Sequence, residues 1–201
     1  MCHKERNALK GTSALLYVEW GEKQEFDKRP SCRSRQRWYD FPEREWAKVL
    51  WPMIHNDRQN VFWNSNNVAV DHNLFEILGY DNEILWGSLA WTAQILFREL
   101  HGRANLGQGA LKTEGIDIRT FYALGVKSQS IIMALKNARS KLSLRATGSV
   151  QDESKSNERR SLDNIIFDIL GLTQGERDAV YEAVINLVEA RLKKAGSLHK
   201  S

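Results

Sequence analysis

Basic and aromatic side chains are concentrated in one short stretch of the sequence, KRPSCRSRQRWYDFPEREW (Lys28–Trp46). Its first ten residues contain five Lys or Arg and no Asp or Glu, and the aromatic residues Trp38, Tyr39 and Phe41 follow. The planar guanidinium group of arginine suits phosphate oxygens or the edge of guanine, and a neighbouring aromatic ring can stack on a base. The candidate nucleic-acid contacts in this stretch are Arg33, Arg35, Arg37 and Tyr39.

The same stretch also fits a solvated loop whose rings are anchored in the core. Trp38 and Phe41 taken singly fit a core position better than a contact surface. The net charge of the whole chain is only +4, so the chain is not polybasic. Any attraction for an acidic partner therefore depends on where the cations gather.

Two further stretches have residue types that could contact DNA. GRANLGQGALK (Gly102–Lys112) contains two cations and three glycines, and glycines let a backbone approach a phosphate closely. In NSNN (Asn64–Asn67), an asparagine could pair with adenine. A tight connection and a simple turn are the alternatives for these two stretches. Their candidate contacts are Arg103, Gln108, Lys112 and Asn64.

Motifs for catalysis are absent from the sequence. None of the three prolines adjoin, so the Asn/Asp-Pro-Pro-Tyr loop of amino-methylating enzymes is missing, and so is the phosphate-binding pattern G-x-x-x-x-G-K-[ST]. Glu153 and Lys155 form an E-x-K pattern of the kind that nucleases use with Mg²⁺, but they lie in a polar segment. We expect no catalytic residue, no metal site and no cofactor in this chain.

Composition predicts a folded, reduced, cytoplasmic protein. The chain has 201 residues, of which 42% are hydrophobic, and seven are tryptophan, which is enough for a core. Its two cysteines, Cys2 and Cys32, cannot form a disulfide framework. The sequence contains neither an apolar run of 18 residues nor a secretory leader pattern.

The pattern of turns and apolar residues predicts an α+β fold with a small, mainly antiparallel β-unit. A short helix is expected at Glu43–Trp51, ended by Pro52. The expected strands are Ala14–Glu19, Val61–Trp63, Val68–Val70, Leu74–Leu78 and about Ala110–Thr113.

The second half of the chain has helical periodicity. Apolar residues three and four apart predict one helix from Asp81 to near Gly102 and another from about Ser128 to Leu144. Residues 147–158 are polar and are predicted to be a linker. A C-terminal helical hairpin follows, with a capping box formed by Thr173 and Glu176. The expected division is a first domain (1–146), the linker (147–158) and the hairpin (159–201).

Several stretches, taken in order, resemble one known family. They are LLYVEWGE, RPSCRSRQRWYDF, VFWN, LHGRANLGQGALKTEGIDIR and LDNIIFDILGLTQGERDAVYEAVINLVEARLKKA. They resemble the C-terminal region of large single-chain N6-adenine DNA methyltransferases of restriction–modification systems, and the resemblance covers nearly the whole chain. Its most specific parts are C-R-x-R-x-x-W-Y-D and G-R-x-x-L-G-x-G-A-L-K.

The resemblance implies a target-recognition module. In that family the region follows a catalytic domain that binds S-adenosylmethionine and carries the Asn-Pro-Pro-Tyr loop, and neither is present here. The expected partners are double-stranded DNA and a catalytic methyltransferase domain or subunit. Flipping the target base costs a few kcal/mol, and a second domain that grips the duplex repays this cost at the right sequence. The alternatives are a protein–protein module that docks through the C-terminal hairpin, and a nuclease-like enzyme using Glu153 and Lys155.

Overall fold

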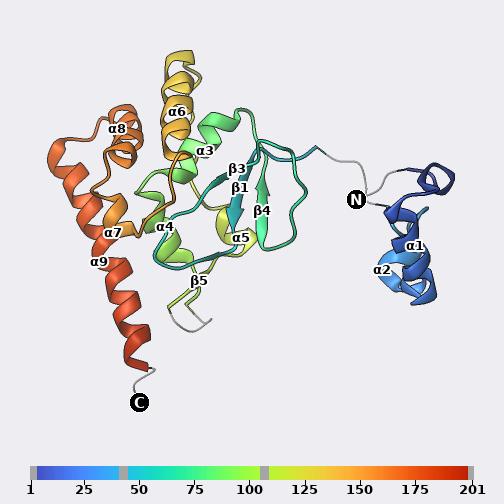
Figure 1. Cartoon of the computed structure of the whole chain (residues 1–201). Coiled ribbons are helices and arrows are strands. Elements are labelled where there is room, and N and C mark those ends of the chain that lie inside the picture. The colour runs from blue at the N-terminus through green and yellow to red at the C-terminus, as the bar shows by residue number, and fades with distance from the viewer. Residues whose placement is uncertain (1–3, 41–44, 105–108, 199–201) are drawn as a thin grey trace. The chain divides into compact units, whose positions relative to one another are not determined.

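The computed structural model describes residues 4–40, 45–104 and 109–198 (Figure 1). The chain divides into two compact units, Met1–Glu45 and Trp46–Ser201, called here the N-terminal and the C-terminal unit. Helices combine with small antiparallel sheets. The predicted α+β fold is confirmed.

The described part of the N-terminal unit is helical. Its elements are η1 (Arg6–Leu9), α1 (Ser13–Lys23), η2 (Phe26–Lys28) and α2 (Pro30–Arg33). The predicted strand at Ala14–Glu19 is wrong, because this segment lies in α1. Thr12 caps the helix by accepting a hydrogen bond from the Leu15 backbone N–H (3.3 Å). The buried residues Val18 and Gly21 are three apart, which is the spacing of one helix face and not of a strand.

A glycine in α1 gives the basic stretch its anchor. The Trp38 ring lies directly against Gly21, where a Cβ atom would overlap the ring. The Trp38 indole N–H donates to a Glu22 carboxylate oxygen (3.4 Å), and the same oxygen accepts from Arg6 Nη1 (2.5 Å). Trp38 therefore fixes the stretch to α1, as the prediction of an anchoring ring requires.

The C-terminal unit is built on two small sheets. In the first, β1 (Val49–Pro52) lies between β3 (Phe62–Trp63) and β4 (Leu74–Ile77), and both pairings are antiparallel. In the second, β2 (Ile54–His55) pairs with β5 (Leu111–Lys112). The predicted strands at 61–63, 74–78 and 110–113 are confirmed within a residue or two.

Two predictions in this region are wrong. Part of the predicted helix at Glu43–Trp51 is strand β1, whose residues Val49, Leu50 and Trp51 are all buried in the middle of a sheet; residues 41–44 lie outside the described residues. No strand forms at Val68–Val70. The Asn64 side chain bonds both the N–H and the C=O of Val68 (2.9 Å each), so these groups are already satisfied locally.

One predicted helix is in fact two. Residues 81–102 form α3 (Asn82–Ala90) and α4 (Gln94–His101), with a corner at 91–93. Asp163 of α8 (Asn157–Leu170) accepts hydrogen bonds at this corner from Thr92 N (2.8 Å) and Thr92 Oγ1 (2.6 Å), and also from the Tyr181 hydroxyl (2.9 Å). A contact distant in the sequence therefore holds the break in place, and local periodicity contains no sign of it.

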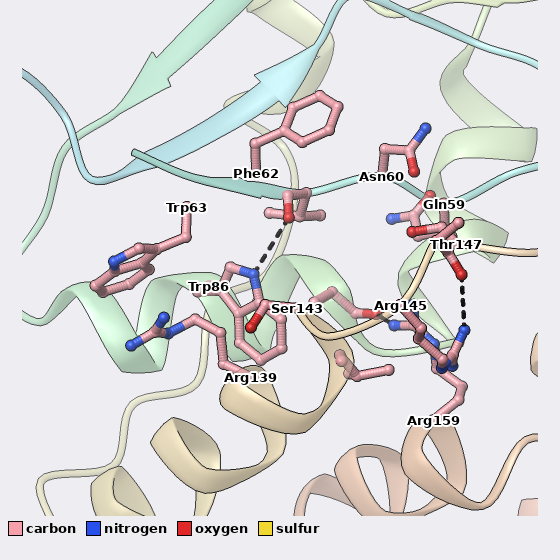
Figure 2. A pocket seen from close by; sticks show the side chains of 14 residues that line it. Gln59, Asn60, Phe62, Trp63, Trp86, Arg139, Ser143, Arg145, Thr147 and Arg159 are labelled. Carbon is pink, nitrogen blue, oxygen red and sulfur yellow. Dashed lines mark hydrogen bonds between the residues drawn. The ribbon is translucent and has the colours of Figure 1, made fainter. Parts of the chain in front are cut away.

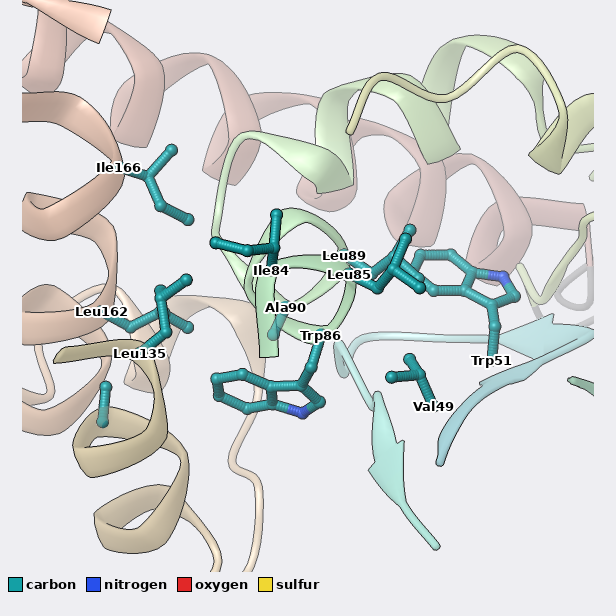
Figure 3. Close-up of a cluster of buried hydrophobic side chains, with 11 residues drawn as sticks. Val49, Trp51, Ile84, Leu85, Trp86, Leu89, Ala90, Leu135, Leu162 and Ile166 are labelled. Carbon is teal, nitrogen blue, oxygen red and sulfur yellow. The ribbon is translucent and has the colours of Figure 1, made fainter. Parts of the chain in front are cut away.

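The remaining helices complete the core. They are α5 (Gly115–Ile118), α6 (Gln129–Leu142), α7 (Val150–Glu153), α8 (Asn157–Leu170) and α9 (Gln174–Leu198). Figure 3 shows Val49 and Trp51 of β1 facing α3, with Leu135 of α6 and Leu162 and Ile166 of α8 on its other side. Helix α6 confirms the predicted helix at 128–144.

The C-terminal end of the chain is a helical hairpin. Gly171 ends α8 in the left-handed conformation (φ 66°). Thr173 and Glu176 form the predicted capping box, in which Thr173 N donates to the Glu176 carboxylate (2.8 Å) and Glu176 N donates to Thr173 Oγ1 (3.4 Å). The predicted linker at 147–158 is folded, since it contains α7, and Val150 and Glu153 are buried. The functional division of the chain at this segment stays a prediction.

Candidate nucleic-acid interface

The basic segment, defined as Lys28–Arg37, presents two exposed arginines one helical turn apart. Arg29 is the N-cap residue of α2, and Arg33 ends that helix and donates its backbone N–H to Arg29 O (2.8 Å). Residues four apart in a helix lie on the same side. Within the described part of the chain, neither guanidinium has an ion-pair partner; that of Arg29 lies 4.2 Å from the centre of the Phe26 ring.

The other predicted contacts of this unit have partners inside the chain. Arg37 donates through Nε (3.0 Å) and Nη2 (2.6 Å) to Asp40 and through Nη1 to Glu5. Arg35 Nη1 donates to the Asp40 backbone oxygen (2.9 Å), and the Tyr39 hydroxyl donates to Lys4 O (3.4 Å). These bonds tie the end of the segment to the start of the unit.

The pKa of Arg37 is raised, first by its hydrogen bond to Asp40 and further by the charges of Asp40 and Glu5. Asp40 and Glu5 are thus engaged with Arg37. Arg29 was not among the contacts predicted from the sequence. Its four-residue spacing from Arg33 across Pro30 could have indicated it, because proline is favoured in the first turn of a helix.

The glycine stretch of the C-terminal unit brings two predicted contacts together. Arg103 and Lys112 exchange both backbone hydrogen bonds (2.9 and 3.1 Å) as an antiparallel bridge, called here the loop neck. Residues directly opposite in such a bridge have neighbouring side chains. Two ion pairs partly balance their charges: Arg103 with Asp117 (3.9 Å) and Lys112 with Glu114 (2.7 Å). Gln108 lies outside the described residues.

Asn64 has a structural role in this conformation. Its side chain is 4% exposed and donates to Ala47 O (3.1 Å) and Val68 O (2.9 Å). Its oxygen accepts from Val68 N (2.9 Å). The arrangement matches the alternative of a simple turn, because both sides of the amide are already used.

A cavity of about 400 Å³ lies beside the edge strand β3 in the C-terminal unit (Figure 2). Aromatic rings of Phe62, Trp63 and Trp86 form part of its wall, and Arg139, Arg145 and Arg159 enter it from α6, from the segment that follows and from α8. Its size suits a small ligand and its arginines suit an anion. Whether it can bind an anion depends on whether those arginines are already paired with carboxylates.

Each arginine of the cavity has a carboxylate partner. Arg139 binds Glu83 through two bonds (2.9 and 2.8 Å) and lies 3.7 Å from the centre of the Trp63 ring. Arg145 (2.5 and 2.8 Å) and Arg159 (3.1 Å) share Glu153. The cavity arginines therefore stabilise the packing of β3, α3, α6 and α8, and they present less charge than their number suggests.

Glu153 is the centre of this network. Burial alone would raise the pKa of its carboxyl group, but hydrogen bonds from Arg145 and the Gly148 backbone and the charge of Arg159 lower it to about 2. In the E-x-K pattern, Glu153 is thus engaged in ion pairs with Arg145 and Arg159, while Lys155 is exposed. Among the described residues, no group of three or more His, Cys, Asp or Glu side chains could hold a metal ion.

Residues 2–152, more than half of the chain, match the sequence model of a family described as type II methyltransferase M.Eco57I, C-terminal domain. The chain belongs to this family. The match confirms the resemblance, and it covers both the basic segment and the loop neck of this chain. Comparisons with curated proteins and with solved structures found no match. In the described part of the chain, no helix has the length and apolar character needed to cross a lipid bilayer.

Proposed function

We propose that this chain is a target-recognition module that binds double-stranded DNA for an N6-adenine DNA methyltransferase of a restriction–modification system. The observation that carries the proposal is the pair Arg29 and Arg33, exposed one turn apart and without an ion-pair partner among the described residues. A chain of phosphates is a natural partner for such a pair. Family membership supports the same function.

The contacts are divided between the two units. Arg29, Arg33 and Arg35 bind phosphates or a base edge from the N-terminal unit, and the loop neck does so from the C-terminal unit. Arg37 and Tyr39 position the basic segment through their bonds to Asp40, Glu5 and Lys4. Gln108 remains a proposed contact, and Asn64 shapes its turn.

Methylation itself belongs to another domain or subunit. The chain lacks the Asn-Pro-Pro-Tyr loop and any glycine-rich cradle, so we propose that it neither catalyses the reaction nor binds S-adenosylmethionine. Its partners are then duplex DNA and the catalytic methyltransferase part, in the cytoplasm. Calorimetry with S-adenosylmethionine tests this directly: binding at micromolar concentration or tighter would show that the chain holds a cofactor site.

Duplex binding measured against salt concentration tests the proposed function. Each phosphate contact steepens the slope of log K against log salt by about 0.9, so Arg29→Ala with Arg33→Ala is expected to flatten it by up to about 1.8. A matched control removes two exposed lysines of α6, Lys136→Ala with Lys141→Ala. The control pair is expected to change the slope by much less.

Two outcomes would contradict the proposal. One is a wild-type protein whose affinity for duplex DNA does not depend on salt. The other is an Arg29/Arg33 variant that keeps its melting temperature and its full salt slope. The first would favour the protein–protein alternative, in which the C-terminal hairpin docks on a partner without DNA contact.

A further inference from the structure

One arginine of the C-terminal helix reaches three other segments of the C-terminal unit. Arg191 of α9 binds Glu99 of α4 through Nε (2.7 Å) and Nη2 (3.1 Å). Its Nη2 also donates to Asn56 O just after β2 (2.8 Å), and its Nη1 donates to Gly109 O. Since the guanidinium fork is planar and rigid, these contacts fix the segments relative to one another.

The pair that anchors this arginine is almost completely buried. The side chain of Arg191 is 9% exposed and that of Glu99 is 4% exposed. Glu99 also accepts a hydrogen bond from Arg98 Nη2 (3.2 Å), whose side chain is fully buried. Buried charges hold each other at fixed distances because separating them would leave a charge without compensation. The ion pair with Glu99 therefore fixes the position of the Arg191 guanidinium that contacts Gly109.

The segment that Arg191 reaches has a backbone suited to this contact. Gly109 is buried with a φ of +72°, a conformation that favours glycine. A Cβ atom there would lie 3.1 Å from Ala195 Cβ and 3.3 Å from Leu192 Cδ2, so α9 packs directly on the glycine. Two residues further along the chain, β5 begins and leads to Lys112 of the loop neck.

We infer that Arg191 is a positioning residue for DNA binding, which holds the loop neck closed so that Arg103 and Lys112 face the same stretch of phosphates. This inference rests on the proposed function. Two cations directly opposite in a bridge repel each other. The ion pair of Arg103 with Asp117 is long (3.9 Å), and that of Lys112 with Glu114 (2.7 Å) is only partly buried. Lys112 is also paired with Ile54 of β2, and the contact of Arg191 with Gly109 O adds an attachment on the side of the glycine stretch.

Hydrogen exchange of the neck amides tests the attachment without DNA. The Arg103 N–H and the Lys112 N–H bond across the neck and report its opening. We expect Arg191→Ala to speed their exchange roughly tenfold or more, the loss of about one charge-assisted hydrogen bond. Arg191→Lys keeps the charge opposite Glu99 but lacks the fork, so its effect is expected to be intermediate.

The matched control is Arg177→Ala, in the same helix. Arg177 pairs with Asp168 (2.6 Å), so its replacement is expected to leave hydrogen exchange of the neck amides unchanged. If Arg191→Ala leaves exchange at the neck unchanged, or speeds the amides of β1 equally, the inference is overturned. Equal acceleration would mean general destabilisation instead of release of the loop.

Salt-dependent binding tests the link to DNA. Arg191→Ala is expected to flatten the slope of log K against log salt by up to about 1.8, as much as the double variant Arg103→Ala with Lys112→Ala. The variant that combines all three substitutions should have the same slope as the double variant. If Arg191→Ala speeds hydrogen exchange of the neck amides but leaves the salt slope unchanged, Arg191 has no positioning role in DNA binding. If the wild-type protein binds no duplex DNA, the proposed function fails, and exchange alone decides whether Arg191 holds the neck.

Discussion

Arginines in two regions of this protein are treated in opposite ways. In the basic segment, Arg29 and Arg33 are exposed, and the nearby acids Asp40 and Glu5 bind Arg37. In the cavity beside β3, all three arginines are held by Glu83 or Glu153. Arginine and aromatic side chains line the cavity together. The basic segment, however, has the cations that a partner can reach.

The contrast shows that the position of the acids, more than the number of arginines, separates a structural cluster from a contact surface. A paired, buried guanidinium contributes to the fold and is costly to disturb. An exposed, unpaired one contributes little to stability and is available for binding. Variants of the two regions should therefore affect different properties.

Breaking the Glu153 network is expected to have the largest effect on stability. Glu153→Ala leaves Arg145 and Arg159 without their shared carboxylate, and Arg159 is 6% exposed. The free energy of unfolding should fall by about 3 kcal/mol. Urea denaturation measures this, with Glu158→Ala as the control, because Glu158 is more exposed and lies 3.8 Å from Arg145. An equal loss in both variants would mean that the cavity arginines are not structurally special.

The same network predicts a dependence of stability on pH. The pKa of Glu153 falls from its ordinary value to about 2 on folding, so its contribution is fully present above about pH 4.5 and is lost as the pH falls toward 2. Glu153→Gln should therefore be less stable than the wild type at neutral pH and approach it at pH 2. Melting temperatures across this range measure the convergence; parallel curves would exclude Glu153 as the group responsible.

A smaller loss is expected from the anchor of the basic segment. In Gly21→Ala the new methyl group overlaps the Trp38 ring, and overpacking of this kind costs about 1–3 kcal/mol. The loss should be confined to the N-terminal unit, as proteolysis of residues 1–45 would show. Gly175→Ala in α9 is the control, because no heavy atom lies within 4 Å of a Cβ there. Unchanged protection of the N-terminal unit would show that Trp38 is not its anchor.

The smallest effects should separate neighbours within the basic segment. Arg37→Ala removes the bonds to Asp40 and Glu5 and should lower the melting temperature of the N-terminal unit slightly. Arg33→Ala should leave that temperature unchanged and weaken only DNA binding, since Arg33 is exposed. If Arg33→Ala destabilises the unit as much as Arg37→Ala, the basic segment is as structural as the cavity.

The sequence predicted most of the C-terminal unit because local signals there agree with the final packing. Helices α6 and α8 show three- and four-residue periodicity, and α9 begins at its capping box. Predictions failed where a distant contact decides the structure. Asp163 holds the corner between α3 and α4. In α1, the strand-forming composition of Ala14–Glu19 was outweighed by the Thr12 cap and by packing within a helical unit.

The residue types of the candidate site could be predicted from the sequence, but the contacts of each side chain could not. The residue types of the basic segment and the loop neck can be found in the sequence alone. Which arginine is bound to Asp40, and that Arg191 reaches Gly109, depends on contacts across 3 and 82 positions of the chain. Only the longer of these two has no local pattern at all, so α9 had no visible connection to the glycine stretch.

The network around Glu153 also affects how this protein can be shortened for experiments. The family match ends at residue 152, inside α7, one residue before the carboxylate that Arg145 and Arg159 share. A fragment cut there would lose Glu153 and also α8, which covers Leu135. The boundary recognisable by sequence similarity is thus not the boundary of the folded body. A fragment intended to remain soluble should extend through α9.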